Sequence, residues 1–96
     1  MPQPSVTHPH TGTLEVTVDN APRGHLSYSL PDGGTMVVEH VEVDPALRGQ
    51  GLGEQLVGAA VEWARANRRQ IVPMCSYARA VMAKTVEFQD VLKRLP

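Results

Sequence analysis

The sequence is poor in cysteine, in long apolar runs and in excess charge of either sign. Its single cysteine, Cys75, excludes an intramolecular disulfide, which small secreted domains usually need. No apolar run approaches the roughly 20 residues that a membrane-spanning helix requires. Nine Lys and Arg oppose ten Asp and Glu, and the resulting net charge of -1 argues against a nucleic-acid partner. We therefore expect a cytoplasmic protein with no membrane or nucleic-acid partner, acting as a monomer or weak homodimer.

The chain does contain enough apolar material for one core. Hydrophobic residues make up 42% of its 96 residues, which suits a single domain. Residues 1–12 are rich in proline and carry no signal-peptide pattern. We expect a flexible lead-in over 1–12 and a single domain over 13–96. His8 and His10 flank Pro9 in this lead-in and are potential metal ligands, but a flexible arm is the preferred interpretation, and we predict no metal site.

The hydrophobic pattern changes its period along the chain. Alternating apolar residues predict strands over 13–20, 25–30 and 35–43, and the short turns between them favour an antiparallel meander. Helical spacing follows from 51 to 67, and then a short buried strand over 70–76, a helix over 76–83 and a last helical turn over 86–93. Pro73 requires an edge, a bulge or a splayed neighbour in that short strand. The predicted fold class is α/β (an α+β mixed sheet) in the order β-β-β-α-β-α.

A glycine-rich segment joins the third strand to the first helix. It reads Arg48-Gly49-Gln50-Gly51-Leu52-Gly53. Glycines let the backbone turn sharply and expose successive N–H groups, which meet the positive end of the helix that follows. Such a site suits a phosphate or pyrophosphate, and Arg48 can add a charge-assisted bond. The spacing matches neither a Rossmann fingerprint, whose third glycine comes one position later, nor a P-loop, since Glu54 follows Gly53.

The same segment resembles the coenzyme A pyrophosphate motif of the GNAT superfamily of acetyl-CoA-dependent N-acetyltransferases. The matching pattern is Arg48-x-x-Gly51-x-Gly53, preceded by Val43-Asp44-Pro45 at a strand end. The stretches 39–43, 71–78 and 87–92 also resemble the short, single-domain branch of this superfamily, so the likeness covers roughly residues 14–92. One departure is visible, because that branch commonly has threonine where this chain has Val41, which removes a hydroxyl but leaves the backbone groups in place.

The resemblance implies a fold and a cosubstrate. It implies an antiparallel meander followed by two parallel strands that splay apart, with helices packed on the sheet. Acetyl-CoA would lie in the splayed cleft, with its pantetheine arm along one strand and its pyrophosphate on the glycine loop. The implied cofactor-binding residues are Val41, Val43, Arg48, Gly49, Gln50, Gly51, Leu52 and Gly53.

Three residues near that cleft are candidates for catalysis. His40 has a suitable intrinsic pKa to take a proton from the amine, and Glu42 is a possible partner on the same strand face, whereas Glu39 is expected on the other face. Cys75 could accept the acetyl group, line the thiol end of the cofactor, or simply pack as a small hydrophobe. Tyr77 could donate a proton to the departing thiolate or simply pack at a helix start. A solvated sheet histidine is an equally weighted interpretation of His40.

The sequence therefore predicts an N-acetyltransferase that acts on an amine of unknown identity, a small molecule or a protein, by direct transfer or through Cys75. An alternative is a CoA or acyl-CoA binding module without transferase activity, and a third is an interaction domain for which the glycine loop is dispensable. Larger members of the superfamily have additional N-terminal helices at the acceptor site. With 96 residues, we expect an acceptor site that is open, completed by a partner, or absent.

Overall fold

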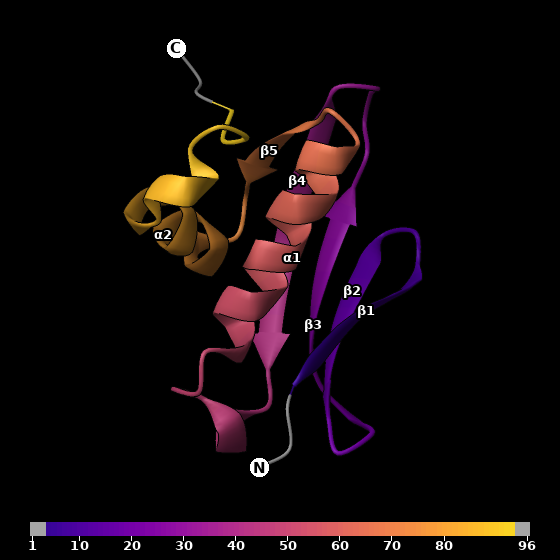
Figure 1. Ribbon diagram of the computed structural model, residues 1–96, viewed down its shortest axis with the longest axis vertical. Helices are drawn as coiled ribbons and strands as arrows, with labels where there is room; N and C mark the ends of the chain where they lie inside the picture. Colours follow the sequence, from indigo (N-terminus) through magenta and orange to yellow (C-terminus); the bar gives the residue numbers. More distant parts are fainter. Residues whose placement is uncertain (1–3, 94–96) are drawn as a thin grey trace.

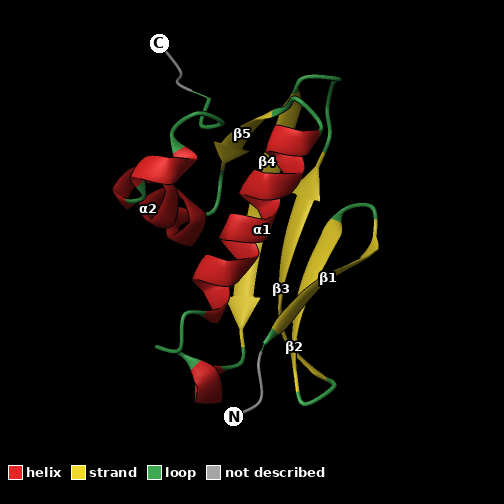
Figure 2. Cartoon of the chain, in the orientation of Figure 1, coloured by secondary structure: helices red, strands yellow, loops and turns green. Residues whose placement is uncertain are grey.

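In the computed structural model, which describes residues 4–93, five strands form one mixed sheet in the order β1-β2-β3-β4-β5 (Figures 1 and 2). The strands are β1 (Ser5–His10), β2 (Thr13–Val18), β3 (Ala21–Ser29), β4 (Thr35–Val43) and β5 (Gln70–Pro73). Neighbours from β1 to β4 pair antiparallel, and β4 pairs with β5 in parallel. The expected meander and mixed α/β sheet are confirmed.

Two α-helices complete the fold of residues 4–93. Helix α1 (Leu52–Ala66) connects β4 to β5, and α2 (Ser76–Lys84) follows β5; short 3-10 turns span Pro45–Leu47 and Val86–Phe88. In Figure 1, α1 lies across the sheet with α2 beside it. Within residues 4–93, no helix is both long enough and apolar enough to cross a membrane.

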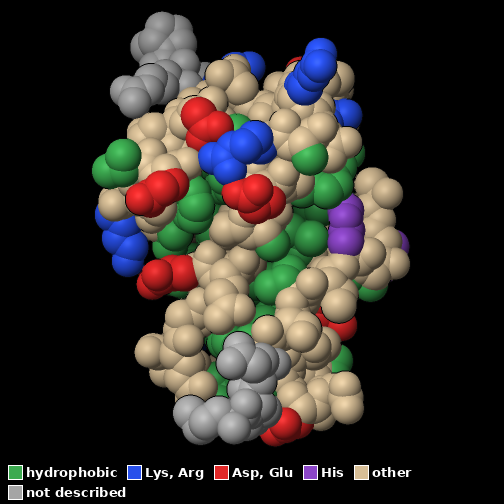
Figure 3. Space-filling view, viewed as in Figure 1, with side chains coloured by type: hydrophobic (Ala, Val, Ile, Leu, Met, Phe, Trp, Pro, Cys, Tyr) green, Lys and Arg blue, Asp and Glu red, His purple; other side chains and the backbone are tan. Residues whose placement is uncertain are grey.

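The core lies between the sheet and α1. Every second side chain along the strands packs against the apolar face of α1, as expected for an amphipathic helix on a half-buried sheet. The buried side chains include Leu14, Val16, Leu26, Met36, Val38, Leu56, Val57 and Val61. Basic and acidic side chains are interspersed over the outside of this helical layer (Figure 3), where Arg65 forms ion pairs with Glu62 and Asp90.

The N-terminal segment differs from the flexible lead-in expected over 1–12. Residues 5–10 form the edge strand β1, in register with β2 through Val6 and Val16. Val6 packs against the core, and His8 contacts the rings of Tyr28 and Trp63. An edge strand tolerates Pro9, because only one side of it needs backbone partners. Residues 1–3 lie outside the described part of the chain.

The parallel pair of strands is shorter than the sequence predicted. Pairing of β4 with β5 ends at Val38 and Pro73, whereas β4 itself continues to Val43. Met74 still donates its N–H to Val38 O at 2.9 Å, after which the chain turns into α2. Ser76 is the first residue of this helix, and Cys75 occupies the capping position without a side-chain bond.

Candidate functional site

The connection from β4 to α1 combines a tight turn with a glycine loop. Asp44 accepts the N–H of Ala46 at 2.9 Å and pairs with Arg23 at 3.3 Å, which fixes the end of β4. The backbone then passes through Gly49 (φ +86°) and Gly51 (φ +80°), a left-handed conformation that favours glycine. Helix α1 begins directly afterwards, so the glycine loop lies between the end of β4 and the N-terminus of α1.

The first turn of α1 has backbone donors that no helical carbonyl accepts. The first helical bond runs from the N–H of Gln55 to Gly51 O at 3.0 Å. The N–H groups of residues 52–54 therefore precede the helical bonding pattern, as at any helix start. A Cβ added at Gly49 or Gly51 would meet no atom within 4 Å, so both glycines border open space. This part of the loop has the donors, the helix dipole and the room that a pyrophosphate needs.

Gly53, the third glycine of the loop, has a different environment. A Cβ at this position would lie 2.6 Å from the Tyr77 hydroxyl and 2.7 Å from its ring, distances that real Cβ atoms do not show. The absence of a side chain at Gly53 is therefore needed for the Tyr77 ring to pack there. The sequence pattern predicts phosphate binding for all three glycines, and it contains no signal for a contact between residues so distant in the chain.

An extra residue in β4 determines which side chains face the helices. Ser27 pairs with His40 and Tyr28 pairs with Val38, so Glu39 is the extra residue of a β-bulge. The bulge turns Val41 and Val43 toward the core, against which both pack. His40 and Glu42 consequently lie on the outer face of the sheet, opposite Ser27 and His25 of β3.

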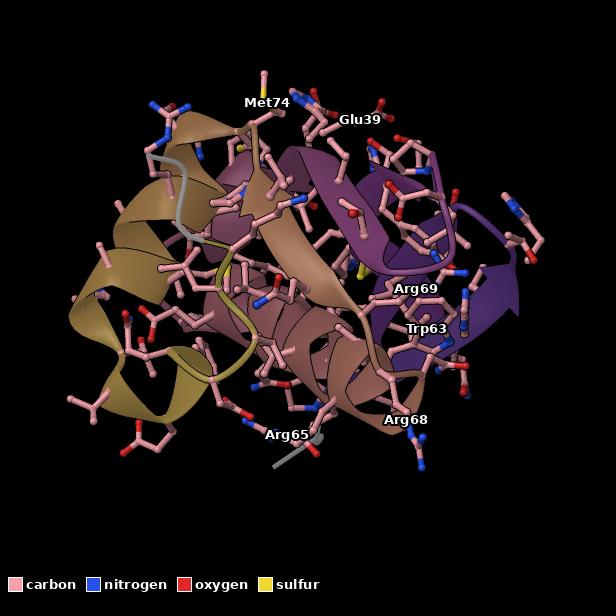
Figure 4. The ribbon with its side chains drawn as sticks, turned by 90° about the horizontal axis from the view of Figure 1, so that it is seen from above. Glu39, Trp63, Arg65, Arg68, Arg69 and Met74 are labelled. Carbon is pink, nitrogen blue, oxygen red and sulfur yellow. The ribbon has the colours of Figure 1, made fainter. Side chains whose placement is uncertain are left out.

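The bulge also corrects one expectation about Glu39. Its carboxylate was expected on the face opposite Glu42, but it accepts a hydrogen bond from Ser29 at 3.2 Å, on the outer face. Figure 4 shows Glu39 and Met74 together on the side of the molecule opposite Arg65 and Arg68. A pleated strand without an inserted residue would have separated Glu39 from Glu42, as the sequence analysis assumed.

His40 and Glu42 form a hydrogen-bonded pair on this outer face. Nε2 of His40 lies 2.8 Å from Oε1 of Glu42. The hydrogen bond from His40 and, secondly, the charge of its ring hold the pKa of the Glu42 carboxyl below its usual value. When the His40 ring is neutral, its Nε2–H donates to the ionised carboxylate, which can only accept, and Nδ1 holds the free lone pair. The His25 ring is 6.3 Å from the His40 ring.

A cleft of about 1070 Å³ joins the β4 edge, the glycine loop and the start of α2. Beside it, β4 has no strand partner on its β5 side beyond Val38, among the residues that the structure describes. The lining residues include most of the predicted site: His40, Val41, Val43, Arg48, Gly49, Gly51, Leu52, Gly53 and Tyr77. Glu42 lines it too, together with His25 and Glu54, which the sequence analysis did not single out.

Two predicted site residues are not among the cleft-lining residues, namely Gln50 and Cys75. Cys75 is half-buried, packs against the core and directs its N–H toward Val38 O at 3.4 Å. These contacts agree with its interpretation as a small packing residue. The tyrosine that follows two positions later, in contrast, faces the cleft.

Tyr77 keeps its proton more tightly than an ordinary phenol. Partial burial raises its pKa, and the nearby charges of Glu54 and Cys75 add to this effect. Glu54 itself pairs with Lys84 at 3.6 Å, so it links the first turn of α1 to the last turn of α2 electrostatically. A phenol that stays neutral at the mouth of a cleft holds a proton that it can donate.

Most of the chain matches one family of known proteins. A family model described as GCN5-related N-acetyl-transferase matches residues 13–91. No curated protein sequence matches the chain. Among solved structures, a GCN5-like protein from Staphylococcus aureus is 28% identical, with a TM-score of 0.76 over 96% of this chain and 90% of its own.

Longer proteins also share the fold. Nourseothricin acetyltransferase is 30% identical, with a TM-score of 0.57 over 64% of this chain and 38% of its own. A Bacillus anthracis structure in complex with acetyl coenzyme A is 21% identical, with a TM-score of 0.58 over 64% of this chain and 35% of its own. The chain therefore spans less than half the length of these two proteins, and the likeness to the second extends to the fold alone.

Proposed function

Because the chain belongs to the GCN5-related N-acetyltransferase family, we propose that it transfers the acetyl group of acetyl-CoA to an amine. One observation carries the proposal: the free edge of β4 and the left-handed glycine loop border the same cleft as His40 and Tyr77. A donor for the transfer and two groups able to move protons thus meet in one place. A fold shared with many proteins would not by itself support this activity.

Donor binding uses two kinds of backbone group. The N–H groups of residues 49–53, at the positive end of α1, receive the pyrophosphate, and Arg48 adds a positive charge from the cleft wall. The backbone of Val41 and Val43 offers hydrogen-bonding groups to the pantetheine arm, in the manner of an added strand. The open space at Gly49 and Gly51 supports this fit, because any side chain there would project into the pyrophosphate position.

Acetyl-CoA supplies a thioester, and its transfer forms a carbon–nitrogen bond while the carbon–sulfur bond breaks and the thiolate leaves. An amine of ordinary pKa, about 10.4 for lysine, arrives protonated and must lose a proton before it reacts. Nδ1 of His40 accepts this proton while Glu42 holds the opposite ring nitrogen. Tyr77 donates one proton to the thiolate, and the second amine proton, which is lost after the bond forms, restores the proton of Tyr77. The balance is one proton released to water per transfer.

Direct transfer is the route we propose, because Cys75 is not among the cleft-lining residues and packs against the core. The Cys75→Ala variant should therefore keep its turnover. After incubation with acetyl-CoA alone, the intact mass of this variant should differ from that of the wild type only by the mass of the substitution. A stable acetyl adduct on the wild type that disappears in this variant would instead establish an acyl-enzyme route.

The test of function is a screen of amines and peptides with CoA release as the readout. We expect at least one amine to give CoA and acetylated product in equal amounts, and His40→Gln to lose most of that turnover at neutral pH. Glu39→Gln is the matched control, since Glu39 lies on the same strand but bonds Ser29. Binding of acetyl-CoA without product from any acceptor class would contradict transfer and leave a CoA-binding module.

A further inference from the structure

The contact between Gly53 and Tyr77 joins the first turns of α1 and α2, which lie beside each other (Figure 1). The Tyr77 hydroxyl and the nearest ring atoms occupy the space that a Cβ on Gly53 would take, at 2.6 to 2.8 Å. Gly53 has no positive φ, so its backbone conformation does not require glycine. What requires glycine at this position is the tyrosine ring.

We propose that Gly53 is a positioning residue, whose missing side chain lets the Tyr77 ring pack against α1 and fixes the phenol at the cleft. The inference rests on the proposed function for Tyr77 as the proton donor. It assigns to the third glycine of the loop a role separate from phosphate binding, for which its N–H group remains available.

A Cβ at Gly53 would move the ring rather than unfold the protein. The colliding atoms are the far end of a side chain that is 41% exposed, so Tyr77 can swing toward solvent. The backbone of α1 gains from the change, because alanine is favoured over glycine in a helix by about 1 kcal/mol. Displacement of the phenol by about 1 Å is enough to lower a catalysed rate roughly 100-fold.

The chain offers a matched control in the same helix. A Cβ at Gly58 would meet only the Phe88 ring at 3.6 Å, an ordinary contact distance. Gly58→Ala therefore makes the same chemical change in α1 without a collision, and Gly58 does not line the cleft. Any effect of the added methyl group on helix stability is common to both variants.

The first experiment is kinetic. We expect Gly53→Ala to lower kcat by roughly ten- to 100-fold with a much smaller change in the dissociation constant for CoA, and Gly58→Ala to change neither. In a Tyr77→Ala background, where no ring is present, Gly53→Ala should cause no further loss of kcat. Equal losses of kcat from Gly53→Ala with and without Tyr77 would overturn the proposal, as would a loss of CoA binding that accounts for the whole rate effect.

The second experiment does not depend on catalysis and separates this inference from the proposed function. In a Tyr28→Phe background, the ring carbon resonance of Tyr77 reports the phenol titration and the contact with Gly53 directly. We expect a nuclear Overhauser contact between the Tyr77 ring and the Gly53 α-protons, and a pKa above the usual 10 that falls back toward 10 in Gly53→Ala. A Tyr77 ring with the same pKa and the same neighbours in both variants would overturn the positioning role, whatever the activity.

Discussion

A charge placed in the glycine loop tests where the donor's pyrophosphate binds. Gly51 borders open space in the cleft, so Gly51→Glu directs a carboxylate into the position that we assign to the pyrophosphate. Gly51→Gln has the same shape without the charge. Both variants meet the same conformational cost of a side chain at φ +80°, about 1 to 2 kcal/mol, which lowers their stability equally.

The difference between the two variants isolates the electrostatic effect. A carboxylate about 6 Å from about two negative charges is repelled by roughly 1.4 kcal/mol in water and more at the lower dielectric of a protein surface. That energy makes the dissociation constant of the Glu variant for CoA at least about tenfold larger than that of the Gln variant. High salt should reduce the ratio, because the site is open to solvent.

The assay is calorimetric titration of both variants with CoA and with pantetheine, which has no phosphate. We expect the Glu variant to bind CoA at least tenfold more weakly than the Gln variant, and the two to bind pantetheine alike. Equal affinities of the two variants for CoA would refute the reasoning, because the pyrophosphate would then lie away from Gly51.

Three further predictions concern the fold that supports the site. Leu26→Ala removes a fully buried core side chain and should lower the free energy of unfolding by about 2–5 kcal/mol in a urea titration; a value near zero would mean that the core is packed differently. The Arg65 guanidinium holds the pKa of Asp90 below its usual value of 3.8, first by a hydrogen bond and second by its charge. This stabilisation is therefore present above pH 3.8 and is lost as the pH falls through the lower pKa of the folded state. Arg65→Met should therefore flatten the loss of thermal stability at acidic pH, and an unchanged profile would contradict the pairing. Val6→Asp should lower the melting temperature because Val6 packs on the core, whereas Thr7→Asp, on the exposed face of β1, should not.

The glycine loop could be predicted from the sequence because its signals are local. A strand pattern ends at Val43, glycines follow at a fixed spacing, and a helical period begins at Leu52. Positive φ at Gly49 and Gly51 and a helix start at Leu52 agree with that prediction. Propensity and periodicity act over a few residues, and this junction is determined at that scale.

The bulge at Glu39 could not be predicted in the same way. It is a mismatch of one residue between β3 and β4, and it exists only in the pairing of two strands. The pattern of valines in β4 conceals it, because Val37, Val41 and Val43 fall at alternate positions, as in an unbroken strand that buries them on one face. The bulge nevertheless decides that Val41 and Val43 face inward, while His40 and Glu42 face outward.

Two other features depend on contacts between distant parts of the chain. Strand β1 was obscured by Pro9 within it and by Pro2 and Pro4 before it, although Val6 and His8 share the alternation that lets them pack on one face. The packing of Tyr77 on Gly53 has no local sequence signal, since each residue can also stand near the start of a helix for unrelated reasons. Such contacts become visible only once the two helices are placed beside each other.

The central claim is that acetyl-CoA binds along the free edge of β4 and across the glycine loop. The most direct test is a titration of the isotopically labelled protein with acetyl-CoA, followed through its backbone amide resonances. We predict the largest shifts and the greatest protection from hydrogen exchange at Val41, Val43 and residues 49–54, with little change in β1 and β2. The absence of shifts at millimolar acetyl-CoA, or shifts confined to residues outside this cleft, would contradict the account.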